Sequence, residues 1–173
     1  MNPTQKQPTT TAALADLTPA DILRCAARYL ELRGWTKSVH YDRTTETAFP
    51  PACITGAIGM AVYGDHTPIL NGNDGDCDPA LRHLADYYLW RDGHVPEHDY
   101  YGALCASDRE IIADFNDHAG HILADVLDVL CDAADDYDWT HATEDDLETY
   151  ADACVWAEKN PTRAGFLAWR AAR

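Results

Sequence analysis

The chain has 173 residues, 46% of them hydrophobic, which is enough apolar material for one domain whose core needs no disulfide staple. Its formal net charge of −16 argues against direct binding of nucleic acid or an anionic membrane, because phosphate groups are bound by Lys and Arg. The six cysteines form no C-x-x-C pair and no apolar stretch reaches the roughly 20 residues that span a bilayer, so we expect a cytoplasmic protein with free thiols.

The N-terminal third begins with polar residues 1–13, which predict a disordered tail. A helix follows, with Thr18 as its N-cap and Asp21 completing a capping box. Gly34 marks its end. The Thr-rich, β-branched residues near 36–49 predict either an ordered loop or one short β-hairpin.

The next helix lies in the apolar stretch after Pro51, and its spacing predicts a buried element with Cys53 at about the third helical position. Each interior glycine costs a helix about 1 kcal/mol relative to alanine, so Gly56 and Gly59 predict the close approach of another backbone. The predicted buried stripe consists of Ile54, Ala57, Ile58, Ala61 and Val62.

Helical periodicity continues through the rest of the chain. Further helices are expected to start at Asp78, Ser107, Thr143 and Asn160, with another over 121–134 and a weak one near 99–106. We therefore expect a mainly α fold of about five to seven helices, with a helical core domain over 14–134. Residues 135–173 form an acidic C-terminal helical extension that we expect to pack on this core.

Cys53 is the first candidate for chemistry, since a cysteine near a helix N-terminus faces unpaired N–H groups and a dipole that can lower its pKa from about 8.5 to about 3.5–7.5. A Cys-His-Asn constellation can be written with His118 as base and Asn116, or Asp117, as the orienting group. Other histidines are equally open as the base, among them His40, His66, His83 and His121. The preferred alternative is a sulfur that packs as a small hydrophobe, shut away from water.

Two histidine pairs have spacings that suit zinc on a helix, in the sequences HVPEH (94–98) and HAGH (118–121). Pro96 disrupts a helix through the first pair and Gly120 weakens one through the second. Solvated loop histidines are therefore preferred, and we expect neither a metal nor a cofactor.

The C-terminal third is the most acidic part of the chain, with eight acids and no Lys or Arg between Asp132 and Glu148. The helix after Thr143 could meet a basic groove with its acidic face and Trp156, or it could be a solvated outer face over the core. The candidate binding residues of the chain are Trp35, Asp117, Trp139, Asp145, Asp146 and Trp156.

Three short motifs resemble a family of small actinobacterial and actinophage proteins of unknown function. They are Arg33-Gly34-Trp35, the Cys-Ile-Thr-Gly-Ala-Ile segment from Cys53, and the segment 112–117 followed by Gly120. Members usually have W-N-D-x-x-G-R-T where this chain has FNDHAGHI, so the expected Thr cap after Gly120 is missing. The resemblance implies an actinobacterial or phage setting and no particular reaction.

The leading functional interpretation is a soluble, non-enzymatic binding or regulatory protein whose acidic C-terminal surface meets a protein with a basic surface. The first alternative is a small cysteine-dependent hydrolase or transferase using Cys53. The second is an acidic decoy that occupies a DNA-binding protein by imitating phosphate spacing.

Overall fold

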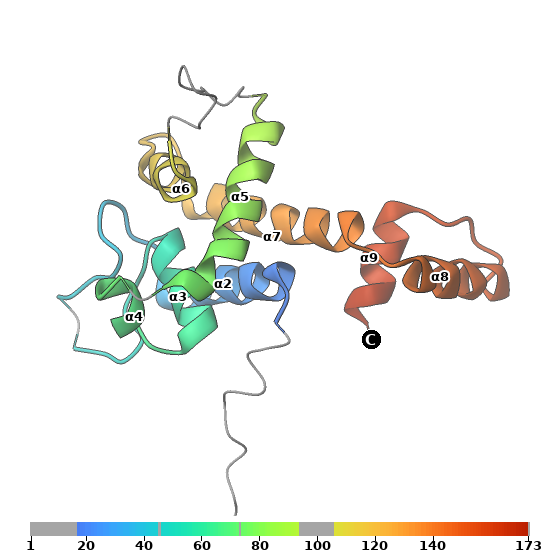
Figure 1. The fold of residues 1–173 in the computed structure, drawn as a ribbon, viewed down its shortest axis with the longest axis horizontal. Coiled ribbons are helices and arrows are strands. Elements are labelled where there is room, and N and C mark those ends of the chain that lie inside the picture. Colours follow the sequence, from blue (N-terminus) through green and yellow to red (C-terminus); the bar gives the residue numbers. More distant parts are fainter. Residues whose placement is uncertain (1–16, 45, 73, 94–105, 173) are drawn as a thin grey trace, which may run out of the picture.

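The computed structural model describes residues 17–44, 46–72, 74–93 and 106–172, and within these ranges it confirms a mainly α fold without strands (Figure 1). The expected tail over 1–13, the histidine pair at 94–98 and most of the weak helix near 99–106 lie outside the described residues. The helices are α2 (Pro19–Arg33), α3 (Ile54–Tyr63), α4 (Thr67–Leu70), α5 (Asp78–Arg91), α6 (Asp108–Asp117), α7 (Leu123–Thr140), α8 (Glu144–Trp156) and α9 (Arg163–Ala171), with a 3-10 turn η1 (Gly75–Cys77).

The helix starts follow local side-chain chemistry. Capping boxes form at Thr18, Ser107 and Thr143, as the sequence predicts, because each hydroxyl accepts from a backbone N–H three residues on. Asp78 is the first residue of α5 rather than its cap. At the start of α7, where the Thr cap is missing, the Ile122 N–H donates to the Asp125 carboxylate at 2.9 Å.

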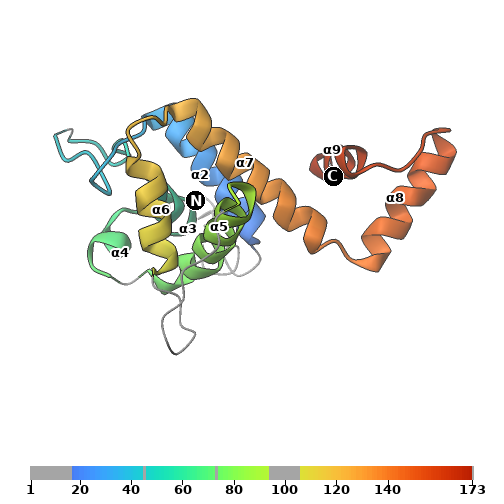
Figure 2. The ribbon, with the colours of Figure 1, turned by 90° about the horizontal axis from the view of Figure 1, so that it is seen from above.

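The main core forms where α2 and α7 lie side by side, with α3 and α5 packed against α2 (Figure 2). Leu23, Leu30, Ile58 and Leu130 have no exposed surface in this core. None of the helices in the described ranges is both long and apolar enough to cross a membrane.

Of the two alternatives for the residues near 36–49, the structure has the loop, and no β-hairpin forms among the described residues. Only two isolated bridges occur among the described residues, and both involve Ala52, which pairs with Trp35 on one side and with Tyr41 on the other. The Ala52 N–H donates to the Gly34 carbonyl at 3.2 Å. Residues 35–36 and 41–42 therefore both bond to the segment ahead of α3.

Helices α8 and α9, called here the C-terminal unit, carry a small second core of Tyr150, Cys154 and Phe166 beyond the end of α7 (Figure 1). The predicted domain boundary at residue 134 falls inside α7. Asp138 of α7 is only 5% exposed and links the two parts, since it contacts Arg24 of α2 at 2.7 Å and Arg170 of α9 at 3.3 Å.

Candidate functional site

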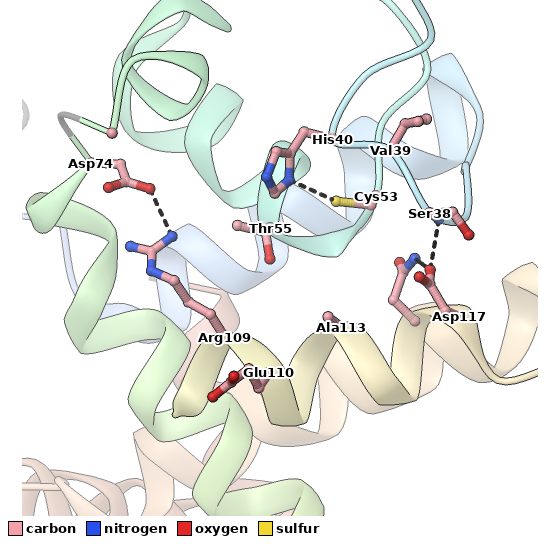
Figure 3. A pocket seen from close by; sticks show the side chains of 12 residues that line it. Ser38, Val39, His40, Cys53, Thr55, Asp74, Arg109, Glu110, Ala113 and Asp117 are labelled. Atoms are coloured by element: carbon pink, nitrogen blue, oxygen red, sulfur yellow. Dashed lines mark hydrogen bonds and ion pairs between the residues drawn. The ribbon is translucent and has the colours of Figure 1, made fainter. Parts of the chain in front are cut away.

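A pocket of about 560 Å³ lies between the N-terminus of α3, helix α6 and the loop residues 38–40 (Figure 3). Figure 3 shows the imidazole of His40 directed at Cys53, while Arg109 and Asp117 of α6 lie across from them. The lining residues that carry the argument are His40, Cys53, Thr55, Arg109, Asn116 and Asp117.

Cys53 is the N-cap of α3, not its third helical residue. Its backbone is extended, with φ −77° and ψ 176°, and its N–H donates to the His40 carbonyl at 3.1 Å. The helix therefore begins one residue later, at Ile54. The Cys53 sulfur accepts from the Gly56 N–H at 3.4 Å, which is the bond that an N-cap side chain makes.

The sulfur of Cys53 also lies 3.6 Å from Nδ1 of His40, within hydrogen-bonding distance for sulfur. Helix α3 is buried along most of its length, as the sequence predicts. Cys53 itself is 8% exposed, yet its side chain borders the pocket and the His40 side of that pocket is open to solvent. The helix is thus interior while its thiol meets an imidazole at the pocket wall.

The electrostatics of Cys53 differ from the sequence prediction. Burial raises the pKa of its thiol, and the nearby Asp117 carboxylate raises it further. Hydrogen bonds from the Gly56 and Thr55 N–H groups lower that pKa, but the net shift is upward. The lowering of the Cys53 pKa that a helix N-terminus can cause does not occur, because desolvation outweighs it, and the thiol is protonated at neutral pH.

Asn116 lines the pocket, and its hydrogen bonds connect the elements of the pocket wall instead of orienting a histidine. Its Oδ1 accepts from Trp35 Nε1 at 2.7 Å and from the Ile54 N–H at 3.1 Å. Its Nδ2 donates to the Thr36 carbonyl at 3.1 Å and to Asp117 Oδ1 at 2.7 Å. The side chain is 3% exposed. It joins α6, α3 and the loop after α2, so Asn116 and Trp35 act as the frame of the site.

Asp117 stands at the rim of the pocket. Its Oδ1 accepts from the Ser38 N–H at 2.8 Å, which fixes the loop that carries His40. Partial burial alone would raise the pKa of Asp117, but the hydrogen bonds from Ser38 and Asn116 and the charge of Lys37 together lower it. The carboxylate is therefore ionised at neutral pH.

His118 does not lie beside Cys53. It is exposed, it does not line the pocket, and its Nδ1 accepts from the Gly120 N–H at 3.2 Å. The histidine that lies beside Cys53 is His40, which the sequence left open as an alternative. The His118 and His121 rings are 4.5 Å apart, but no group of three metal-binding side chains occurs in the described part of the chain.

Gly56 explains how His40 reaches Cys53. A Cβ at this glycine would lie 2.3 Å from the His40 carbonyl oxygen, so only glycine lets the loop run this close to α3. The predicted backbone approach is thus correct at Gly56. It is wrong at Gly59, where the neighbour is the Ile69 side chain, 2.2 Å from a Cβ built there.

Arg109 forms the far wall of the pocket, a role that no sequence motif indicated. Its guanidinium contacts Asp74 at 2.7 Å and Asp78 at 2.9 Å, which ties α6 to the start of α5. The partners are 35 and 31 residues away along the chain, so the only signal in the sequence was their opposite charge.

The remaining candidate binding residues lie on α7 and α8, away from the pocket (Figure 1). Trp139 is 38% exposed, and its ring packs edge-on against Phe166 at 5.7 Å. The Asp146 carboxylate accepts from the Thr143 hydroxyl at 2.8 Å, so it serves the start of α8. Asp145 is exposed, and Trp156 is 89% exposed.

Comparison with known proteins finds a match over the part of the chain that contains the pocket, and none over the C-terminal unit. A family model described as a family of unknown function (DUF6197) matches residues 14–136, a range that contains every residue lining the pocket and ends before α8. No curated protein and no solved structure matches the chain. The protein therefore belongs to DUF6197, a family of unknown function.

Proposed function

We propose that the pocket is the working site of this protein and that Cys53 is its nucleophile in acyl transfer or hydrolysis, with His40 as the base. The observation that carries the proposal is the 3.6 Å contact between the Cys53 sulfur and His40 Nδ1 at the wall of a pocket. Cys53 must be a free thiol for this role, and it is one in the structure. Such a role suits the cytoplasm, where thiols stay reduced.

The choice of cysteine at the start of α3 supports chemistry over packing. Ser, Thr, Asp and Asn are the strong N-caps, and other described helices of the chain use Thr18, Ser107, Thr143 and Thr162. Cys53 caps α3 with a weak sulfur acceptor at 3.4 Å. A hydroxyl would cap the helix better, so capping alone does not account for sulfur at this position.

The raised pKa of Cys53 defines how the thiol would react. His40 Nδ1 takes the proton from the sulfur while the sulfur attacks the carbonyl carbon of an ester substrate. A new S–C bond forms, the bond from the acyl carbon to the alkoxy oxygen breaks, and the proton passes from the imidazole to the departing alcohol. Water then attacks the thioester with His40 again as base, which releases the acid and restores the thiol.

The test uses p-nitrophenyl acetate as an acyl donor and the full-length protein. We expect release of p-nitrophenol and an acetyl group on Cys53, located by peptide mass mapping. Cys53→Ser abolishes this acylation while retaining the cap. His40→Gln lowers the rate about a hundredfold, the scale of general-base catalysis. His118→Gln is the matched control, because this exposed ring lies outside the pocket, and it leaves the rate unchanged.

Two results would overturn the proposal. One is an equal rate of ester cleavage in Cys53→Ser and the unmodified chain. The other is acetyl found only on the exposed cysteines, Cys25 and Cys131, after reaction of the native protein. Either result returns Cys53 to a packing and capping role.

A further inference from the structure

We propose that the outer face of α8 docks a basic amphipathic helix of another protein. Three large apolar side chains of this helix face solvent: Leu147 is 41% exposed, Val155 is 75% exposed and Trp156 is 89% exposed. Val155 and Trp156 are adjacent at the end of α8, and exposed apolar side chains that lie together are typical of interaction sites. The proposal is independent of the pocket, since α8 lies beyond the residues that the family model matches.

The exposed groups form an ordered pattern along α8. Leu147, Ala151 and Val155 follow one another at intervals of four residues, so they form one stripe along the helix. The acidic residues Glu144, Glu148 and Asp152 have the same spacing and form a row directly beside this stripe. Trp156 follows Asp152 by four residues, so its aromatic ring lies at the C-terminal end of the acidic row.

The row of α8 on the other side of the stripe already has its partner, because Tyr150 and Cys154 follow Leu147 and Ala151 by three residues and so lie directly beside them. Tyr150 and Cys154 are 7% and 5% exposed, and they form a cluster with Phe166 of α9. Tyr150 also bonds across to Thr162, whose carbonyl accepts from the Tyr150 hydroxyl at 3.2 Å. In the described part of the chain, then, α9 covers one face of α8 and the apolar stripe with Val155 stays open to water.

Charge selects the kind of partner. A second copy of this chain would bring the same acidic row and a net charge of −16 to the interface, and like charges oppose that contact. A nucleic acid is repelled for the same reason. A partner helix with Lys or Arg beside an apolar stripe fits α8, because its apolar side chains would pack on the stripe and its basic side chains would face the acidic row. Amphipathic helices bind in this way through side chains at positions such as i, i+4 and i+8.

The experiment titrates the full-length protein with a synthetic amphipathic Leu/Lys helix peptide, and with a scrambled peptide of the same composition. We expect saturable 1:1 binding of the first peptide by calorimetry and at least about tenfold weaker binding of the scrambled one. Val155→Ser and Trp156→Ala each weaken binding about tenfold. Trp90→Ala is the matched control, because Trp90 of α5 is 71% exposed and lies off this surface, and it leaves binding unchanged.

Three outcomes would overturn the proposal. Equal binding of both peptides would show attraction by charge alone. Binding that salt abolishes but that Trp156→Ala does not change would favour the acidic decoy, which needs charge and no apolar stripe. A dimer in sedimentation experiments that Trp156→Ala dissociates would assign the stripe to a second copy of the chain. All substituted side chains are exposed, and circular dichroism confirms that each variant keeps its helix content.

Discussion

The pocket wall and the C-terminal unit are held together in different ways. Around the pocket, side chains bond across long separations in the chain, as when Asn116 joins Trp35 and Ile54. The C-terminal unit has a core of three buried side chains and a local capping box, and it is joined to α7 by the Asp138–Arg170 and Asp136–Arg163 ion pairs and by the packing of Trp139 on Phe166. The pocket therefore depends on a few buried polar groups, and we expect the C-terminal unit, whose core is small, to open more readily than the pocket.

The largest effect on stability is expected for Asn116→Ala, which removes the side chain whose hydrogen bonds connect the elements of the pocket wall. The Trp35 and Ile54 donors lose a buried acceptor, and each unsatisfied group costs about 1–3 kcal/mol. We expect a loss of about 3–4 kcal/mol in the free energy of unfolding, measured with urea. Asp114→Ala, an exposed site on the same helix, should change it by less than about 0.5 kcal/mol. Equal losses of stability in the two variants would contradict the role of the Asn116 hydrogen bonds in holding the pocket wall together.

Gly56→Ala should have the next largest effect. The added Cβ would lie 2.3 Å from the His40 carbonyl, so the loop must move away from α3. We expect a net loss of about 2 kcal/mol, because the overpacking exceeds the gain of about 1 kcal/mol in helix propensity. The control is Gly75→Ala, because a Cβ at Gly75 would have no heavy atom within 4 Å, so the loss is smaller. Thermal unfolding of both variants compares them directly.

Asp138→Ala should separate the two regions. Its carboxylate is shared by Arg24 and Arg170, and because both arginines are partly exposed, water can replace part of what they lose. We expect a cost of about 1–2 kcal/mol and faster amide exchange in α9 with little change in α3. Asp132→Ala, at an exposed site on α7, should leave the free energy of unfolding and the amide exchange of α9 unchanged. Equal acceleration in α3 and α9 would show that the regions unfold as one.

The smallest effect concerns Asp117 and pH. Its folded pKa is lowered, so its contribution to stability is fully present above the unfolded value of about 3.9 and is lost as pH falls through the folded value. Asp117→Asn keeps acceptors for the Ser38 N–H but lacks the charge. The stability difference between the two proteins should be constant at neutral pH and shrink below about pH 4. A difference that persists in acid would locate its origin elsewhere.

Local chemistry made the helices predictable, and tertiary contacts decided the site. Thr18, Ser107 and Thr143 are N-caps because their hydroxyls satisfy nearby N–H groups, information that lies within four residues. The pairing of Cys53 with His40 depends on how the loop crosses α3 at Gly56, which periodicity does not encode. His118 was a reasonable base by composition, but its loop turns it toward solvent.

The same limit applies to the other differences. The residues near 36–49 have strand-like composition, but Trp35 and Tyr41 both pair with Ala52 in isolated bridges, and no ladder forms among the described residues. Helix propensity placed Cys53 inside α3, whereas the bond from its N–H to the His40 carbonyl makes it the cap. Desolvation of the sulfur, which sets the direction of its pKa shift, follows from packing that only the folded chain reveals.

The most direct test of the Cys53–His40 pair is the rate of alkylation by iodoacetamide at about pH 7.5, where an ordinary imidazole is neutral, followed cysteine by cysteine with peptide mapping. A buried thiol with a raised pKa should react more slowly than the exposed Cys25 and Cys131 unless an imidazole accepts its proton. We predict that Cys53 reacts first and that His40→Gln reverses this order. Alkylation of Cys25 and Cys131 with Cys53 untouched in the native protein would contradict the account.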